Sequence, residues 1–473
     1  MESISAAIGR LLGSPAFKFF LICGLILMLT IPLLLVWGLV GEREQRAAGV
    51  RQDVAREWGG SQFINGPLLI VPYTVKRVTG EGDKRVEELI ERRAVFLPQV
   101  LNIDGKATTK VLHRSIYDVA VYTGILNFEG RFAAPDMSEV AADVQSVRWH
   151  DAVLALAVSD VSGLKAAASL HVDGGDTLSF EPSIGVPGTR VDGIHVRLAS
   201  AANLFAAPSG AADASPAAQA TPLKGFTFKF GLTLNGSSEL TFAPVAQQTT
   251  VALSSDWRDP SFTGAFLPTD RVLNPAAFAA RWMVPHLARS VPQSWSLADQ
   301  DLERLNPYSF GVRFIVPVDF YQLVSRAAKY AMMFLATAFM AVFLLELRSS
   351  REVHPVQYLF VGLTMIFFYV LLLSLAEQIG FLWAYLIAAV ATGGLLSLYV
   401  ARVQASLGKG LIMAVMFFVL YGLLYLILRL EDYALLAGAV AGFLMLAVVM
   451  FSTLAVNWSG TKTPLEGGKI PAE

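Results

Sequence analysis

The hydrophobic positions of this chain gather into six long runs, one near the start and five near the end. The first covers about residues 17–40, and the other five lie between Ala327 and Val456. A run of 18 or more apolar residues is long enough to cross a bilayer as a helix. The pattern predicts a multi-domain membrane protein with an α-helical transmembrane bundle of six helices, one N-terminal plus five C-terminal, and a large water-exposed domain at 41–326.

The five C-terminal runs predict helices at 327–347, 356–376, 379–401, 409–428 and 433–456. The joints between them are short, so neighbouring helices should be antiparallel. The first run is too long for the apolar core of a cleavable signal peptide, and no small-x-small cleavage pattern follows it. We therefore expect 17–40 to remain in the protein as a signal anchor.

Most of residues 41–326 have the sequence pattern of a β domain. A short polar helix is expected at 42–58, where Gly59-Gly60 should end it. Beyond it, short β-branched and aromatic segments alternate with Gly, Pro and Asn turns, which favours a β-rich, sandwich-like fold. In one segment Phe226, Phe228 and Phe230 occupy alternate positions, so their rings should share one buried face.

Three local features of this region carry specific expectations. Residues 151–161 and 163–172 suggest a strand pair with a tight turn at Ser162-Gly163. Asn235-Gly236 is a strong hairpin signal. Residues 199–222 are rich in Ala, Ser and Pro, which predicts a flexible insert that either divides the domain into two β lobes or decorates a single one.

Charge is concentrated in the β-rich region and nearly balanced there. Residues 41–326 contain 27 Lys and Arg against 30 Asp and Glu, a net charge of −3. A domain of this kind lacks the basic footprint of a nucleic-acid-binding protein. The only cysteine, Cys23, lies in the first apolar run, so no intramolecular disulfide can form.

Basic residues in the short joints indicate an orientation, because they favour the cytoplasmic side. Joints on one side carry Arg348, Arg351 and Arg402, with Lys409 at a boundary, whereas joints on the other carry only Arg429. This places residues 1–16 and the 457–473 tail in the cytoplasm and the β-rich domain outside it. The basic residues that count against this orientation are Arg43, Arg46, Arg51, Arg326 and Lys329.

No motif predicts catalytic, cofactor-binding or metal-binding residues, and we expect the protein not to be an enzyme. The six histidines are scattered, and no zinc-protease, nucleophile-elbow or P-loop pattern occurs. His150 and Asp151 are adjacent, with Asp160 further along. Neighbours in a strand face opposite ways, which argues against a catalytic dyad.

Ionisable residues near membrane depth are candidates for function, because burying a charge in lipid is costly. They are Glu346, Glu377 and the cluster Arg429, Glu431 and Asp432. All fall at predicted helix ends, where headgroups and water should solvate them. The absence of charge near any helix centre weakens a transporter interpretation.

Two further patterns have both a structural and a functional interpretation. Gly438 and Gly442 permit close helix contact, which we expect within the bundle rather than at a dimer face. Residues 256–268 combine Trp257, Arg258 and Phe262, residue types that anchor interfaces but also fill cores.

Several segments resemble the CreD family of bacterial inner-membrane proteins, which is associated with cell-envelope integrity. They are residues 66–72 (GPLLIVP), 116–124 (IYDVAVYTG), 256–268 (DWRDPSFTGAFLP), 319–331 (DFYQLVSRAAKYA) and 354–363 (HPVQYLFVGL). The insert at 199–222 has no counterpart. The resemblance implies an inner-membrane location, a large periplasmic domain, and links to envelope stress, tolerance of toxins such as colicins, and β-lactam response. It brings no catalytic residue, cofactor or ligand.

Three functions follow as hypotheses. The leading one is a non-enzymatic envelope protein whose β domain binds a periplasmic protein, a lipid or a cell-wall component. The second is a transporter or lipid-handling protein, which would need a polar cavity between its helices. The third is a periplasmic hydrolase, which would need His150, Asp151 and Asp160 to converge. Membrane lipids are expected partners, and the oligomeric state stays open.

Overall fold

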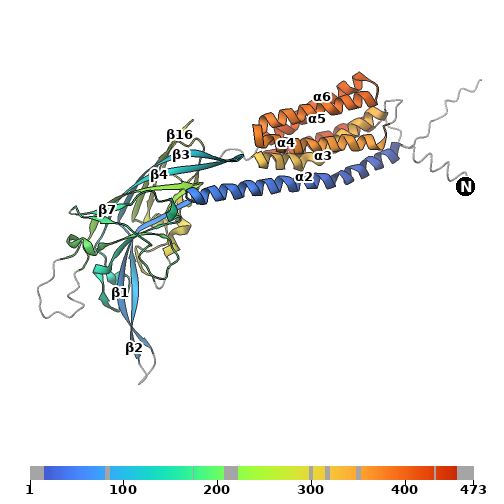
Figure 1. Cartoon of the computed structure of the whole chain (residues 1–473). Coiled ribbons are helices and arrows are strands. Elements are labelled where there is room, and N and C mark those ends of the chain that lie inside the picture. Colours follow the sequence, from blue (N-terminus) through green and yellow to red (C-terminus); the bar gives the residue numbers. More distant parts are fainter. Residues whose placement is uncertain are drawn as a thin grey trace, which may run out of the picture. The chain divides into compact units, whose positions relative to one another are not determined.

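The computed structural model describes residues 15–79, 86–173, 175–206, 222–297, 302–314, 320–347, 353–430 and 433–454 of the 473-residue chain. The chain forms two compact units (Figure 1). The first unit comprises residues 1–47 and 318–473, and the second comprises residues 48–317. Four residues named in the sequence analysis lie outside the described residues. They are Arg348 and Arg351, which contribute to the predicted orientation, and the candidate functional residues Glu431 and Asp432.

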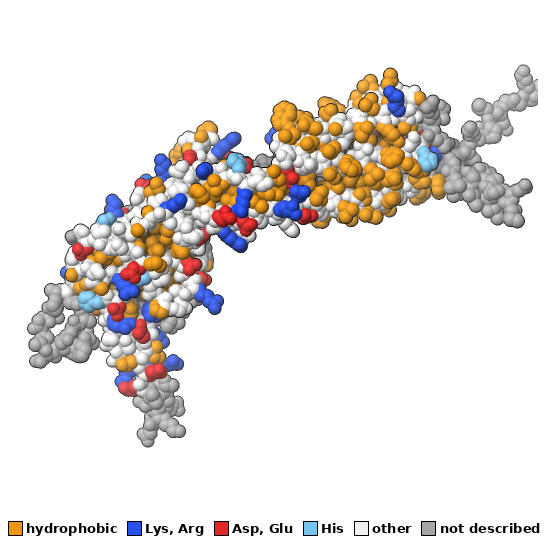
Figure 2. Space-filling view, in the orientation of Figure 1, with side chains coloured by type: hydrophobic (Ala, Val, Ile, Leu, Met, Phe, Trp, Pro, Cys, Tyr) orange, Lys and Arg blue, Asp and Glu red, His pale blue; other side chains and the backbone are white. Residues whose placement is uncertain are grey.

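The first unit is a helical bundle. Six helices in the described part of the chain are long and apolar enough to cross a membrane, which confirms the one-plus-five arrangement. Hydrophobic side chains cover the visible face of these helices (Figure 2). The helices are α2 (Pro15–Trp58), α3 (Phe320–Leu347), α4 (Pro355–Ile379), α5 (Phe381–Val403), α6 (Leu407–Arg429) and α7 (Ala434–Thr453).

Helix α2 is continuous over 44 residues, so the short helix expected at 42–58 is an extension of the anchor. Gly59 ends it with φ 134°, a conformation that favours glycine. The last turns of α2 belong to the second unit, where Val54 packs against Val119 and Val121. The Trp58 indole N–H donates to the carbonyl of Tyr122 at 3.3 Å.

The second unit is β-rich, as predicted, and contains two sheets. The ten-stranded sheet has the order β14-β18-β12-β1-β6-β10-β9, with β2 and β5 beside β1 and β17 beside β2. Its strands are β1 (Gln62–Thr79), β2 (Val86–Phe96), β5 (Val144–Val147), β6 (Val153–Val158), β9 (Glu181–Pro182), β10 (Gly193–Arg197), β12 (Glu239–Phe242), β14 (Pro260–Gly264), β17 (Ser294–Ser296) and β18 (Phe310–Phe314).

The eight-stranded sheet has the order β15-β16-β13-β3-β4-β11-β7-β8. Its strands are β3 (Val100–Arg114), β4 (Tyr117–Phe132), β7 (Ser169–Val172), β8 (Thr177–Ser179), β11 (Phe226–Ser237), β13 (Gln248–Ser255), β15 (Asp270–Asn274) and β16 (Ala277–Pro285). Both sheets contribute to one hydrophobic core. Phe226, Phe228 and Phe230 all point into this core, which confirms the period-two prediction.

The expected strand pair at 151–172 is wrong. Strand β6 pairs with β1 and β10, whereas β7 pairs with β11 and β8 in the other sheet. The residues between them form the short 3₁₀ helix η4 (Val161–Gly163). The chain crosses from one sheet to the other here instead of turning back, because each strand completes a different side of the shared core.

The expected hairpin at Asn235-Gly236 is also wrong. Both residues continue β11 and pair with β4, and β12 then joins the other sheet. Gly236 is needed for space rather than for a turn, because a Cβ there would lie 2.3 Å from the Tyr122 hydroxyl oxygen. The left-handed conformation of the crossing falls instead on Ser238, with φ 59°.

Most of the Ala-rich insert, residues 207–221, lies outside the described residues. Its two flanks meet in an antiparallel bridge between Phe205 and Leu223. The Ala206 amide also donates to the carbonyl of Pro222 at 3.0 Å. The chain thus returns to the point where it left, and one core spans both sheets, so the insert decorates a single domain rather than dividing two.

Candidate functional site

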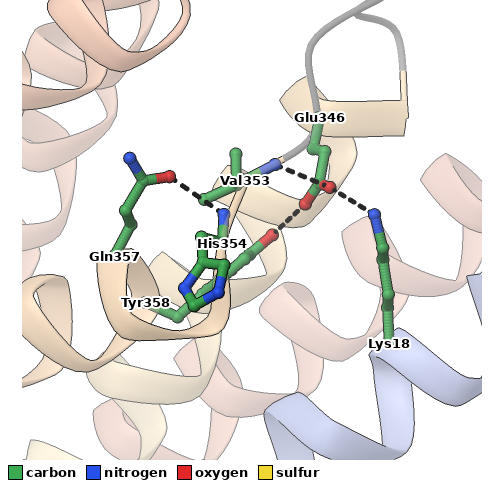
Figure 3. A network of polar contacts seen from close by, with 6 residues as sticks. All are labelled: Lys18, Glu346, Val353, His354, Gln357 and Tyr358. Atoms are coloured by element: carbon green, nitrogen blue, oxygen red, sulfur yellow. Dashed lines mark hydrogen bonds and ion pairs between the residues drawn. The ribbon is translucent and has the colours of Figure 1, made fainter. Parts of the chain in front are cut away.

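A buried carboxylate at one end of the bundle joins three segments that are distant in the sequence. Glu346 is 6% exposed and lies in the last turn of α3. It accepts hydrogen bonds from the Lys18 ammonium at 2.9 Å, the Val353 amide at 3.0 Å and the Tyr358 hydroxyl at 2.7 Å (Figure 3). We call these residues the Glu346 network. They tie α2, α3 and α4 together at one point.

The start of α4 is fixed beside this network by a reciprocal cap. The His354 Nδ1 accepts from the Val356 amide at 3.3 Å, and the Gln357 side chain accepts from the His354 amide at 2.9 Å. This arrangement satisfies backbone donors that the first helical turn leaves unpaired. Pro355 opens the helix at a position where no amide donor is required. The cap therefore positions Tyr358 one turn later.

A cavity of about 270 Å³ opens next to the Glu346 network. Its polar lining comes from Lys18, His354 and Tyr358, and its apolar lining from Phe17, Leu21, Ile22, Val353 and Pro355. A buried carboxylate, an ammonium and a hydroxyl beside a small cavity can hold a proton or a small polar group.

The opposite end of the bundle has a matching contact. Glu377 accepts from the Tyr321 hydroxyl at 3.1 Å and lies 3.9 Å from the Arg43 guanidinium. The 25 helical rises between Lys18 and Arg43 span about 37 Å, slightly more than the ~30 Å hydrocarbon core of a bilayer. The two ion pairs thus hold both ends of the anchor against the bundle.

The expectation that Glu346 and Glu377 are solvated at helix ends is therefore wrong in one respect. Both lie at helix ends, but their side chains are only 6% and 10% exposed. Each carboxylate is paired because a cation and a tyrosine from other helices reach it. The sequence places all four partners near run boundaries, yet nothing in their spacing pairs them.

The helix interior contains polar contacts that the sequence reasoning missed. The hydroxyls of Thr392 and Tyr421 are 2.9 Å apart, and the Tyr385 hydroxyl donates to the Tyr421 carbonyl at 2.5 Å. Thr392 lies midway along α5, so this contact is near the centre of the bundle. The signal was the presence of Thr and Tyr inside apolar runs, where such groups need partners.

The bundle also has an apolar groove of about 810 Å³ along α3, α6 and α7. Residues from all three helices line it, including Met340, Leu420 and Val440. Close packing of α7 against α3 beside this groove explains why positions 438 and 442 are glycine. A Cβ at Gly438 would lie 2.6 Å from the Tyr330 ring, and one at Gly442 would lie 3.3 Å from the Met333 sulfur. Both face α3, inside the bundle as expected.

In the β domain, a groove of about 580 Å³ adjoins strand β2. We call it the β2 groove. Its charged lining comes from Glu91, Arg92, Arg93, Arg190 and Glu303, and its remaining lining from Val186, Pro187, Gly188, Thr189, Val191, Leu297 and Leu302. The lining thus combines side chains of both charge signs with apolar side chains, which suits a ligand with polar and apolar parts.

The residues of the hydrolase hypothesis do not converge. His150 and Asp151 lie not in a strand but in the short 3₁₀ helix η3 (Trp149–Asp151), just before β6. The His150 ring stacks on Phe205, and Asp151 faces Arg148. Asp160 lies beyond the other end of the same strand. The six residues of β6 separate the two ends by about 20 Å. His150, Asp151 and Asp160 therefore do not form a common catalytic site.

Asp160 has a clear structural role. Burial raises the pKa of its carboxyl group, but hydrogen bonds from the Ser162 hydroxyl, the Gly60 amide and the Ser162 amide outweigh that effect and hold the pKa below its usual value. The Gly60 amide is 2.7 Å away and the Ser162 amide 3.0 Å. The side chain caps η4 and ties it to the chain that follows α2.

The aromatic residues at 256–268 serve the core. Trp257, Phe262 and Phe266 pack against the hydrophobic cluster, and Phe262 contacts the rings of Phe278 and Trp282 edge-on. Arg258 is exposed and faces Asp259 at 3.8 Å. The segment is mainly core and turn material. Among the described residues, no group of three or more His, Cys, Asp or Glu could hold a metal ion.

Comparison with known proteins identifies close similarity along almost the whole chain. A family model described as "Inner membrane protein CreD" matches residues 14–459. The inner membrane protein CreD of Escherichia coli (strain K12) is 29% identical over 455 residues, which covers 96% of this chain and 96% of the relative. The matched region includes the anchor, the β domain and all five C-terminal helices.

Proposed function

The chain belongs to the CreD family of inner membrane proteins. We propose that it supports cell-envelope integrity and the envelope-stress response, including tolerance of colicins. In this proposal it acts without catalysis, as a scaffold whose periplasmic β domain binds a periplasmic protein or a cell-wall component. The six-helix bundle holds that domain at the membrane.

The β2 groove is the observation that carries the proposal. It is a preformed depression of about 580 Å³ in the β domain, and its lining includes charged groups of both signs as well as apolar side chains. Among the described residues, Arg190 and Glu303 have no ion-pair partner, so their charges are available to a ligand. Recognition sites typically combine such a few placed polar groups with apolar lining.

The periplasmic placement of the β domain is supported by the bundle geometry. The Lys18–Glu346 pair groups the start of α2 with the end of α3. In an antiparallel bundle the same end includes Arg402 and Lys409. In the sequence, Arg348 and Arg351 follow directly after α3. This end is the cytoplasmic one under the positive-inside rule. The end of the anchor that leads to the β domain then faces the periplasm.

Cysteine labelling tests this orientation. In a Cys23→Ser background, Leu287→Cys places a thiol on an 85% exposed side chain of the β domain, and Leu407→Cys places one on an 86% exposed side chain at the start of α6. An impermeant maleimide should label position 287 in cells with a permeabilised outer membrane, and position 407 only after lysis. The reverse pattern would contradict the orientation.

Complementation tests the function. Deletion of the gene should sensitise cells to detergents and cell-wall drugs. We expect a Glu303→Lys and Arg190→Glu double variant to reach the membrane at normal levels without restoring resistance. Arg258→Glu, a change on a 79% exposed side chain away from the groove, is the matched control and should restore it. A deletion strain with an unaltered envelope would overturn the proposal.

Lipid handling is a second candidate, favoured by the 810 Å³ apolar groove along α3, α6 and α7. Within a bilayer, the group available to fill such an apolar groove is the acyl chain of a lipid. Filling the groove with Ala437→Phe and Ala441→Trp should then reproduce the deletion phenotype. If the filled variant restores resistance, the groove has no role in function.

A further inference from the structure

Among the described residues, one edge of strand β2 is paired only in part. On its inner side β2 pairs with β1 along its whole length, from Val86 to Phe96. On its outer side β17 covers only Ala94 to Phe96. The last bond there runs from the Leu297 amide to the Arg93 carbonyl at 2.8 Å. Within the described part of the chain, no strand pairs with the outer side of β2 before Arg93.

The backbone bonds show which groups face outward. The Leu97 amide donates to the Gln293 carbonyl, and the Arg93 carbonyl accepts from Leu297, so odd-numbered positions of this strand face β17. Because backbone groups alternate sides along an antiparallel strand, Glu87, Leu89 and Glu91 present their N–H and C=O groups on the open edge. No described group bonds to those backbone atoms.

The open edge runs into the β2 groove, since Glu91, Arg93 and Leu297 line that groove. Leu89, in the middle of the edge, is 67% exposed although it is a large apolar residue. Charged side chains on an edge strand discourage pairing with an arbitrary chain, and β2 carries Glu87, Glu88 and Glu91. The combination of open backbone groups, these carboxylates and an exposed leucine suits a partner strand with basic and apolar side chains.

We propose that an extended peptide segment of a periplasmic protein adds to this edge as an extra strand and extends into the β2 groove, where its charged side chains meet Arg190 and Glu303. Only a peptide backbone offers donors and acceptors at the spacing that Glu87, Leu89 and Glu91 require. The inference rests on the proposed function, because it names the partner class of the same groove.

The test uses full-length protein in detergent and linear twelve-residue peptides selected on it from a phage-displayed library. Hydrogen exchange read at single residues by mass spectrometry gives a specific signature. With a selected peptide bound, the amides of Glu87, Leu89 and Glu91 should exchange at least tenfold more slowly. The amides of Glu88 and Ile90 already pair with β1 and should change little.

Two variants at one position separate the backbone from the side chain. Leu89→Pro removes an outward N–H group without breaking a hydrogen bond between β2 and β1. The variant should therefore bind the selected peptide about tenfold more weakly. Leu89→Ala keeps that N–H and should weaken binding less. Slow hydrogen exchange of the Glu88 and Ile90 amides in the Leu89→Pro variant verifies that β2 remains paired with β1.

Several outcomes would overturn the inference. They are the failure to select any peptide, binding that leaves the three edge amides unprotected, and protection by purified cell-wall fragments but not by peptides. Protection that appears without peptide and disappears on dilution would assign the edge to a second copy of the chain. A Leu89→Pro variant that fails to bind the peptide but still fully restores envelope resistance to the deletion strain would contradict the link between the peptide site and the proposed function. The Glu303→Lys and Arg190→Glu double variant would then test that function by itself.

Discussion

The Lys18 ammonium lies 2.9 Å from a carboxylate oxygen of Glu346, although 328 positions separate the two residues. The pair joins the first membrane helix to the end of the second, and the Tyr358 hydroxyl adds a bond from the third. Glu346 is almost fully buried, whereas Lys18 is 27% exposed. The charge of the acid is therefore compensated inside the protein, and its partners are what make its burial tolerable.

Glu346→Gln should destabilise the bundle by about 1–3 kcal/mol, since the amide keeps one acceptor but loses the charge that binds Lys18. The loss stays moderate because Lys18 can still reach water. Thermal unfolding of the purified protein in detergent measures it. Glu42→Gln, which breaks the exposed Arg46–Glu42 pair, is the control and should cost less than about 0.5 kcal/mol. Equal losses in the two variants would contradict the special role of the buried pair.

His354→Ala should lower stability by about 1 kcal/mol, because it removes the acceptor that caps the Val356 amide at the start of α4. His354→Asn supplies another short acceptor and should retain most of the stability. Denaturant unfolding of both variants in the same detergent provides the comparison. If the Asn variant is as unstable as the Ala variant, the cap does not stabilise the helix.

The membrane part of the fold was largely predictable, and the reason is physical. A helix in lipid satisfies its own backbone, so its location depends on local apolar length. The five C-terminal helices accordingly appear where the runs fall. The pairing of Glu346 with Lys18 was not predictable, because it depends on which helices become neighbours. A side chain at a run boundary looks solvated until its neighbours are known.

The β domain shows the complementary limit. The alternation at Phe226 and Phe230 predicted a buried face correctly, because it follows from strand geometry alone. Asn235-Gly236 has the sequence of a tight turn, yet it continues a strand. The deciding factor is Tyr122 on the neighbouring strand, which occupies the space beside Gly236. Non-local packing of this kind overrides turn propensity.

Gly236→Ala should destabilise the β domain by about 1–3 kcal/mol, because the new methyl group would meet the Tyr122 ring at 2.4 Å and its hydroxyl oxygen at 2.3 Å. Gly231→Ala lies in the same strand, and its nearest contact would be the Asn127 side chain at 3.5 Å, so it should cause no loss. Tryptophan fluorescence during denaturant unfolding reports on both. A Gly236→Ala protein as stable as the control would refute the steric explanation.

Asp160 should make the β domain sensitive to acid. Its folded-state pKa is below the ordinary value of 3.8, so the carboxylate contributes stability that is fully present above that value and is lost as the pH falls through the folded-state pKa. The stability difference between the natural protein and Asp160→Asn should therefore be largest near neutral pH and shrink below about pH 4. Unfolding midpoints from pH 7 to pH 3 measure this difference. Asp192→Asn, a change on an exposed side chain, should give a small difference at every pH. A difference for Asp160→Asn that stays constant down to pH 3 would show that the bonds from Gly60 and Ser162 do not depend on the charge.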